Sequence, residues 1–275
     1  MTTATDNGLR VLDGGQLRLL RAIDSVFRRL ADGWDAPEFR FPFLMQCRDL
    51  DMFDYYDNFP HLGLAATRLD PERVAPLLAE SGRPLERIPT EVMQPTGFAL
   101  PSAACYAIYV ELAGTTLPAE GAMRTTLGTC FRNEDHYDGL QRLLGFSMRE
   151  IVCIGPEDVA KNHLLRAKDA VQTLCAELGL DFEIEVATDP FFDKNSGKAK
   201  MQRLFPVKEE FVVNGLAIGS VNYHRNFFGE RCGIQAGDAT AHTSCLAFGL
   251  ERWVHTLTER FGDTDAAVAA VESLG

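Results

Sequence analysis

The stretch that most constrains the fold runs from residue 129 to 153 and reads TCFRNEDHYDGLQRLLGFSMREIVC. Residues 129–134 and 146–154 alternate as β-strands do, and the polar residues 135–139 between them end in glycine. The pattern predicts two strands joined by a long loop. Arg132 and Glu134 would project from the first strand, and Phe146 and Glu150 from the second. A phosphate-binding cation, a hydrogen-bond acceptor, a stacking ring and a carboxylate would then surround one cleft.

Three short patterns in this stretch resemble motif 2 of the class II aminoacyl-tRNA synthetases, and that of the seryl-tRNA synthetases most closely. They are Phe-Arg-x-Glu at 131–134, Gly-Leu-x-Arg at 139–142 and Phe-x-x-x-Glu at 146–150. A fourth pattern, Gly-Leu-x-Arg at 249–252, resembles motif 3 of the same class. The resemblance implies an α+β fold, the class II catalytic domain, in which helices flank a mostly antiparallel β-sheet.

Two amphipathic segments, one near each end of the chain, are predicted to be helices. Residues 16–31 and 241–261 both carry apolar residues at helical spacing. Residues 38–46 follow the first of them and read as a strand interrupted by Pro42. The first helix and this strand resemble motif 1, which forms the dimer interface in class II synthetases, so the resemblance implies a homodimer. Taken without the later motifs, the pair is an ordinary helix and strand.

The resemblance implies an ATP site built mainly from arginines. Arg132 and Arg252, the expected catalytic residues, would hold the triphosphate in a bent conformation. Planar guanidinium groups that keep their charge suit such bidentate contacts with phosphate. Arg142 would contact the γ-phosphate, Glu134 would accept a hydrogen bond from the adenine amino group, and Phe146 would stack on the adenine.

A predicted hairpin carries the expected Mg2+ ligands. Two alternating segments, 205–213 and 216–224, flank Asn214-Gly215, a strong signal for a tight turn between strands. In seryl enzymes the second strand carries a Glu and a Ser, three residues apart, that hold Mg2+ and the ATP phosphates. Ser220 matches the Ser, whereas Ala217 stands in place of the Glu. Asn222, on the same strand face as Ser220, is a candidate to share this work.

The amino-acid side of the site departs from the seryl pattern in one respect. Pro95-Thr96 matches a conserved dipeptide of those enzymes, but Gly97 follows where they carry a carboxylate that reads the substrate amine. Asp189 matches an Asp that lies near the amino acid. The residues expected to bind the amino acid are therefore Glu150, Asp189 and Asn222.

Two cysteines and a glutamate make a candidate zinc site. Cys105, Glu150 and Cys245 fall on elements that face one pocket in the class II fold, and two thiolates with a carboxylate suit Zn2+ with an open fourth position. A subgroup related to the seryl enzymes uses such a Cys-Glu-Cys zinc: the atypical methanogen-type synthetases and their truncated relatives, the amino acid:carrier-protein ligases. In the alternative interpretation these are buried core cysteines. Cys130, which shares a strand face with Arg132, is the rival ligand.

Composition bounds the compartment and the partners. The net charge of −12 disfavours a general nucleic-acid surface, and no apolar run reaches the roughly 18 residues of a membrane helix. The first residues lack the basic and apolar regions of a signal peptide, and seven cysteines suggest a reducing cytoplasm. We expect a disordered leader over residues 1–14 and one catalytic domain over 15–275, without a tRNA-binding domain.

The resemblance to the carrier-protein ligases implies a specific reaction. Glycine or alanine would be activated by ATP to the aminoacyl adenylate, and the aminoacyl group would pass to the phosphopantetheine thiol of a small carrier protein. No tRNA and no membrane are expected as partners. The carrier protein would meet a basic segment, of which the alternative interpretation is a solvated loop: Lys194, Lys198, Lys200 and Arg203.

Two other functions stay open at this point. One is a synthetase paralogue that senses an amino acid without transferring it, which Ala217 keeps in play. The other is a synthetase fragment that acts on tRNA with a partner protein.

Overall fold

The computed structural model describes residues 7–80 and 85–274. Its elements in chain order are α1 Gly14–Asp32, β1 Glu38–Phe39, β2 Met45–Gln46, α2 Cys47–Met52, α3 Tyr55–Asn58, η1 Pro60–Leu62, β3 Leu64–Leu69, α4 Pro71–Glu80, η2 Thr90–Val92, β4 Met93–Leu100, α5 Tyr106–Glu111, β5 Thr116–Leu117, β6 Ala122–Phe131, β7 Gly145–Gly155, α6 Glu157–Glu177, β8 Glu183–Ala187, α7 Gly197–Leu204, β9 Lys208–Val213, β10 Leu216–Arg225, α8 Phe227–Cys232, β11 Gln235–Ala236, β12 Ala239–Thr240, β13 His242–Gly249, α9 Leu250–Phe261 and α10 Thr264–Glu272.

One sheet of seven strands organises these elements, in the order β1-β6-β7-β13-β10-β9-β8. The short β1 runs parallel to β6, and the other neighbouring strands run antiparallel. The predicted α+β fold, a mostly antiparallel sheet flanked by helices, is therefore confirmed. Two small three-stranded sheets, β12-β11-β5 and β2-β4-β3, lie beside it.

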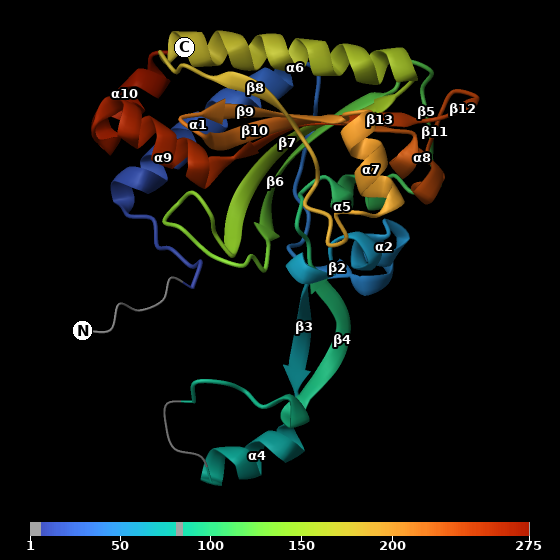
Figure 1. Cartoon of the computed structure of the whole chain (residues 1–275), viewed down its shortest axis with the longest axis vertical. Helices are drawn as coiled ribbons and strands as arrows, with labels where there is room; N and C mark the ends of the chain where they lie inside the picture. Colours follow the sequence, from blue (N-terminus) through green and yellow to red (C-terminus); the bar gives the residue numbers. More distant parts are fainter. Residues whose placement is uncertain (1–6, 81–84, 275) are drawn as a thin grey trace.

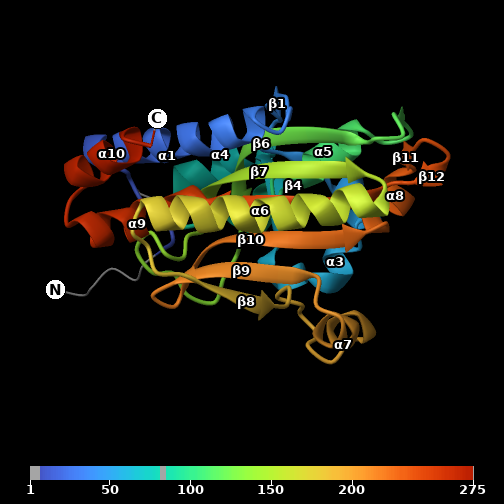
Figure 2. The same ribbon diagram turned by 90° about the horizontal axis from the view of Figure 1, so that it is seen from above.

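Four helices, α1, α6, α9 and α10, cover one face of the large sheet, which we call the helix face (Figure 2). The predicted helix over 16–31 is confirmed as α1, which starts at a capping box between Asp13 and Gln16. Its buried stripe packs on the sheet and on α9. The ring of Phe27 stacks on Phe248 of β13 at 3.8 Å and meets Trp253 of α9 edge-on at 5.2 Å. These contacts bring the two ends of the chain into one apolar core.

The opposite face, which we call the site face, is covered only at one end. There α2, α3, α5 and α8 form a second core, in which Tyr109 stacks on Phe228 at 4.0 Å. From this end the antiparallel pair β3–β4 projects away from the sheet and carries α4 at its tip (Figure 1). The rest of the site face carries charged and polar side chains mixed with apolar ones such as Phe146 and Met148.

The predicted helix over 241–261 is wrong in its first half. Residues 242–249 form β13, a central strand, and only residues 250–261 form a helix, α9. A strand buried on both faces reads as a nearly continuous apolar run, and periodicity alone does not separate it from a buried helix. Cys245 is therefore a strand residue.

The strand predicted at 129–134 is observed as β6, which begins earlier, at Ala122, and ends earlier, at Phe131. Strand β6 ends at Phe131, where its pairing with β7 stops opposite Gly145. Arg132 and Glu134 lie beyond it, because the backbone turns away and the Arg132 amide bonds to the Leu144 carbonyl at 2.9 Å. The second strand is confirmed as β7.

The segment 38–46 is not one interrupted strand. Its first residues, β1, join the large sheet, and its last, β2, join a small sheet with β4. Pro42 lies between them and has no backbone N–H for either ladder.

The hairpin predicted around Asn214-Gly215 is confirmed as β9 and β10. Both turn residues have positive φ, 50° and 78°, as a tight turn that matches the strand twist requires. One residue farther on, β10 contains a bulge. Its register shifts between Ala217, which pairs with Val212, and Gly219, which pairs with Phe211. The extra residue lets Ala217 and Ser220, three apart, both face the site.

The N-terminal leader expected over 1–14 lies partly outside the described residues, which begin at residue 7. Within the described part, the Gly8 carbonyl accepts a hydrogen bond from the Leu144 amide at 2.9 Å, and α1 begins at Gly14. None of the helices in the described ranges combines the length and the apolar composition needed to cross a membrane.

Candidate functional site

Two rows of side chains cross the site face, because residues that pair across a ladder project to the same side. One row runs Glu150, Ala247, Ser220 and Glu210 over β7, β13, β10 and β9. The next row along the same four strands is Val152, Cys245, Asn222 and Lys208. Residues as far apart in sequence as Glu150 and Ala247 therefore meet on one surface.

The three predicted zinc ligands come together at the covered end of this surface. The ligand atoms of Cys105, Glu150 and Cys245 lie within 4.8 Å of one another, and all three residues are buried. Cys105 lies at the start of α5, directly above the two strand residues. One carboxylate oxygen of Glu150, Oε1, accepts backbone hydrogen bonds from Ala104 at 2.8 Å and Cys105 at 3.0 Å. The same carboxylate also interacts with the thiols of Cys105 and Cys245.

The three groups of this cluster change one another's pKa. Burial, and then the neighbouring Cys245, raise the pKa of Glu150 to about 8. Hydrogen bonding to Cys245, with burial next, raises the pKa of Cys105 well above its usual value. The pKa of Cys245 is lowered, first by the hydrogen bond from Cys105 and then by His224. A buried set of two sulfurs and one carboxylate oxygen matches the donors that zinc prefers, and three protein ligands leave a fourth position open.

The rival ligand Cys130 does not join this cluster. It is fully buried and pairs with Phe146 near the other end of β7. The cluster instead has two polar neighbours on β10, since Asn222 Nδ2 lies 3.5 Å and His224 Nε2 3.8 Å from the Cys245 sulfur.

A cavity of about 450 Å³ opens from the Cys-Glu-Cys cluster toward solvent. Aromatic side chains from α5 and α8, with Phe53 and Phe59 on either side of α3 and Phe191 and Phe205 near α7, form much of its wall. Asp189 and Asn222, both expected near the amino acid, also line it. Asp189 is held by Gln202, whose side chain accepts from the Asp189 amide at 2.7 Å and donates to its carboxylate at 2.9 Å.

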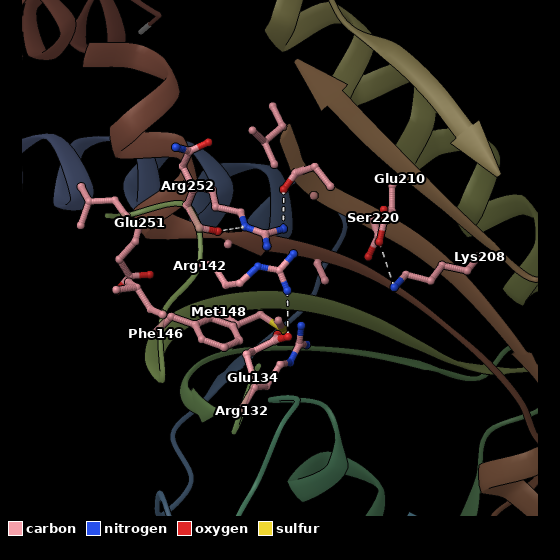
Figure 3. Close-up of a pocket in the computed structure, with 18 residues that line it drawn as sticks. Arg132, Glu134, Arg142, Phe146, Met148, Lys208, Glu210, Ser220, Glu251 and Arg252 are labelled. Carbon is pink, nitrogen blue, oxygen red and sulfur yellow. Dashed lines mark hydrogen bonds and ion pairs between the residues drawn. The ribbon is translucent and has the colours of Figure 1, made fainter. Parts of the chain in front are cut away.

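The residues expected to bind ATP gather in a second, smaller cavity of about 90 Å³ at the open end of the site face (Figure 3). Its lining contains all six of them: Arg132, Glu134, Arg142, Phe146, Ser220 and Arg252. Arg132 lies over the ring of Phe146, with its guanidinium carbon 5.0 Å from the ring centre. We call this cavity the arginine pocket.

Every arginine of this pocket has an internal partner. Arg252 donates to the carbonyls of Gln141 at 2.7 Å and Ala217 at 2.8 Å, and Arg132 donates to the Ser102 carbonyl at 3.0 and 3.1 Å. Arg142 pairs with Glu134 at 2.8 Å. Burial, together with the nearby Arg132 and Arg142, lowers the pKa of Arg252. A bound polyanion would therefore relieve the repulsion among the three arginines. It would also replace the neutral carbonyls that Arg132 and Arg252 now contact.

Three residues of the arginine pocket were missed from the sequence. Glu210 and Lys208 of β9 face it and pair with each other at 3.0 Å, and alternation along KEEFVV signals that these two share a face (Figure 3). Glu251 is buried and accepts from the Ser147 amide at 2.8 and 3.0 Å, which ties α9 to β7. No sequence pattern distinguishes Glu251 from a solvated helix residue.

The basic segment expected to meet a carrier protein is only partly free. Lys198 pairs with Asp54, the residue before α3, at 2.5 Å, and Arg203 donates to the Lys194 carbonyl at 2.8 Å. Much of the segment is helix α7 rather than a loop. The same helix exposes apolar side chains, Met201, Leu204 and, just after its end, Phe205.

Comparison with known proteins finds similar carrier-protein ligases and tRNA ligases. Amino acid–acyl-carrier-protein ligase 1 of Bradyrhizobium diazoefficiens is 34% identical over 227 residues, which cover 78% of this chain and 68% of that protein. The type-2 serine–tRNA ligase of Methanococcus aeolicus is 24% identical over 271 residues, 89% of this chain and 51% of that enzyme. No protein-family model matches the chain.

The fold has a solved counterpart in the seryl-tRNA synthetase of M. kandleri, seen in complex with A. aeolicus tRNASec. It superposes with a TM-score of 0.81 over 99% of this chain and 58% of that one, at 19% identity. The chain thus spans about two thirds of the ligase and about half of the tRNA-dependent enzymes. With a class II synthetase fold and 34% identity over two thirds of the ligase, this chain belongs to the family of amino acid–acyl-carrier-protein ligases.

Proposed function

We propose that this chain activates a small amino acid, glycine or alanine, with ATP and transfers it to the phosphopantetheine thiol of a carrier protein. The observation that carries the proposal is that the arginine pocket and the Cys-Glu-Cys cavity share a wall. Arg132, Lys208 and Ser220 line both of them. A carboxylate held in one cavity would therefore lie beside a phosphate held in the other, as adenylate formation requires.

The arginine pocket would perform the chemistry by positioning and charge stabilisation. Arg132 and Arg252 would hold the phosphates from two sides, with Arg142 at the γ end. Phe146 would stack on the adenine, and Glu134 would leave Arg142 to accept from the adenine amino group. The carboxylate of the amino acid would attack the α-phosphorus, and pyrophosphate would leave.

The Cys-Glu-Cys cluster fits zinc by its donor set, and we propose that Cys105, Glu150 and Cys245 hold it. A bound zinc would supply an open coordination position for the α-amino group of the substrate. Asp189 and Asn222, together with Glu150, would orient the same molecule within the cavity. The alternative of three unrelated core residues does not account for a carboxylate at 1% exposure beside two thiols.

The acceptor would enter through the wider part of the cavity. About 450 Å³ is far more than glycine or alanine needs, so room is left for a thiol-bearing arm. Met201 and Phe205 line its outer part, and Lys194, Lys200 and Arg203 lie on the same segment. We propose that α7 and these cations meet the carrier protein, which is itself acidic in most cases.

We also propose that residues 15–275 act as one catalytic unit and that two copies form a homodimer. The seven cysteines are free thiols in the structure. Free thiols persist in a reducing compartment, which together with the need for ATP favours the cytoplasm.

ATP–pyrophosphate exchange across the amino acids, with zinc content measured on the same sample, tests activation. We expect exchange with glycine or alanine and about one zinc per chain. Incubation with a carrier protein, compared with the same protein lacking its phosphopantetheine arm, then tests transfer. Zinc-bearing protein without exchange would support an amino-acid sensor instead, and charging of tRNA without loading of the carrier protein would contradict the proposed acceptor.

A further inference from the structure

The arginine pocket lacks a carboxylate on β10. Ala217 faces the pocket but offers only a methyl group, while its carbonyl accepts a hydrogen bond from Arg252. Nucleoside triphosphates bind to proteins as complexes with Mg2+. This ion takes oxygen ligands, typically one or two protein carboxylates in addition to the phosphates. Another side chain of this pocket is therefore needed if the metal is to be held by the protein.

Glu210 lies in the appropriate place. It pairs directly with Ser220 across the β9–β10 ladder, so the two side chains stand side by side on the site face (Figure 3). The Ser220 oxygen accepts from Asn222 at 3.2 Å and keeps a second lone pair. Among the charges that act on Arg252, Glu210 is the first that opposes the lowering of its pKa, which places this carboxylate close to the phosphate-binding arginines.

The other two carboxylates that line the pocket are already held by other groups of the protein. Glu251 is fixed by two hydrogen bonds from the Ser147 amide, and Glu134 pairs with Arg142 at the adenine end. Glu210 is about a third exposed, and its one ion pair among the described residues is with the flexible ammonium group of Lys208 at 3.0 Å. Asn222 turns its amide nitrogen toward Ser220 and Cys245, which suits the amino-acid side rather than a cation.

We infer that Glu210, together with Ser220, binds the Mg2+ that accompanies ATP, so that a carboxylate on β9 takes the place of the one missing at Ala217. The inference rests on the proposed function. Lys208 neutralises Glu210 while the metal is absent, and it is free to move toward the substrate carboxylate or the Asp189 side chain, 3.7 Å away, once the metal binds.

The test measures nucleotide binding with and without metal, so it does not depend on turnover. Mn2+ replaces Mg2+ and is followed by electron paramagnetic resonance, while ATP binding in EDTA is followed by calorimetry. For Glu210→Gln we expect Mn2+–ATP affinity to fall at least about tenfold. Metal-free ATP should bind as well as before or more tightly, because one negative charge near the phosphates is gone.

The matched control is Glu209→Gln. Glu209 is the next residue of β9 but pairs with Lys168 of α6 on the helix face, at 2.8 Å, so its loss should change neither affinity. A second variant, Ala217→Glu added to Glu210→Gln, should recover Mn2+–ATP binding by placing a carboxylate on β10.

The outcomes separate the two proposals. Equal loss of metal-bound and metal-free ATP in Glu210→Gln, or no loss of either, would overturn the role of Glu210 while wild-type nucleotide binding stands. Failure of the wild-type protein to bind ATP in any form would overturn the proposed function and the inference with it.

Discussion

Arg149 and Glu150 are neighbours in β7, and they show how differently the two faces of one sheet treat a buried charge. Arg149 points to the helix face with a side chain only 2% exposed, and its guanidinium binds Asp24 of α1 twice at 2.8 Å and Glu38 of β1 at 2.6 Å. Glu150 points to the site face, where its immediate partners are two thiols and two backbone amides.

The same contrast recurs on β13. Ser244 faces α6, where it donates to the Ala160 carbonyl and accepts from the buried His163 ring at 2.9 Å. Its neighbour Cys245 faces the cluster. On the helix face, Arg149 and Ser244 receive their partners from α1, β1 and α6, whereas at the Cys-Glu-Cys cluster on the site face the protein gathers acidic groups whose natural partner is a cation. Buried charge without an internal partner marks where a ligand belongs.

The largest effect that tests this contrast is expected on the helix face. Arg149→Met leaves the Asp24 carboxylate without its partner beside an apolar core, whereas Glu38 keeps Arg28 at 2.7 Å, so we expect the free energy of unfolding to fall by about 3 kcal/mol. Urea denaturation measures it. Arg21→Met, an exposed arginine on α1, is the control and should be nearly neutral. A loss below about 1 kcal/mol for Arg149→Met would show that its ion pairs contribute no more than surface ones.

On the site face, substitution should cost function rather than stability. Glu150→Gln keeps the shape and the backbone hydrogen bonds but removes a charged ligand. We expect zinc content to fall close to zero and exchange activity to fall at least about 100-fold, roughly 2.7 kcal/mol. Zinc analysis and exchange measure this, with Cys175→Ala, a buried cysteine of α6, as control. Full zinc content in Glu150→Gln would refute the ligand assignment.

A smaller loss is expected where the site face already has internal partners. Arg252→Lys keeps the charge but loses the fork that reaches Gln141 and Ala217, so exchange at saturating amino acid should fall about tenfold, near 1.4 kcal/mol. Steady-state kinetics in ATP measure it. Arg260→Lys, in the last turn of the same helix, should leave the kinetics unchanged. Unchanged kinetics in Arg252→Lys would mean that this arginine holds the pocket rather than the phosphate.

The smallest effect concerns His163, whose pKa is lowered by burial from 6.5 to about 3. The unfolded chain therefore binds a proton that the folded chain does not between these pH values, and stability present above pH 6.5 is lost as pH falls. From pH 7 to pH 6 this loss is about 0.7 kcal/mol. Comparing denaturation of wild type and His163→Phe at both values isolates it. An identical pH slope in the two proteins would show that folding leaves the pKa of His163 unchanged.

The sequence predicted the fold well because its main signals, a turn dipeptide and spaced motifs, are each tied to a specific backbone geometry. The tight turn at Asn214-Gly215 and the spacing of Arg132, Arg142 and Arg252 all led to the observed pocket. The helix predicted over 241–261 failed because a central strand and a buried helix look alike in composition. That error did not disturb the grouping of Cys245 with Cys105 and Glu150, which came from the resemblance.

Two parts of the site were beyond the sequence for physical reasons. The internal partners of Arg132 and Arg252 are backbone carbonyls. Every residue has a carbonyl, so no residue type in the sequence predicts these contacts. Glu210 and Ser220 are ten residues apart and become neighbours only through ladder register, which a bulge in β10 displaces by one residue. Alternation counted from the turn would place them on opposite faces.

That bulge also bears on what substitution can change in this site. Substitution alters a side chain, but removing a bulge takes a deletion in a central strand, which would turn every residue beyond it to the other face. Ala217 and Ser220 therefore keep their place at the pocket whatever residues occupy them. Positions 217 on β10 and 210 on β9 both face the pocket, so a substitution at either one changes the chemistry of the site without a change in the register of the sheet.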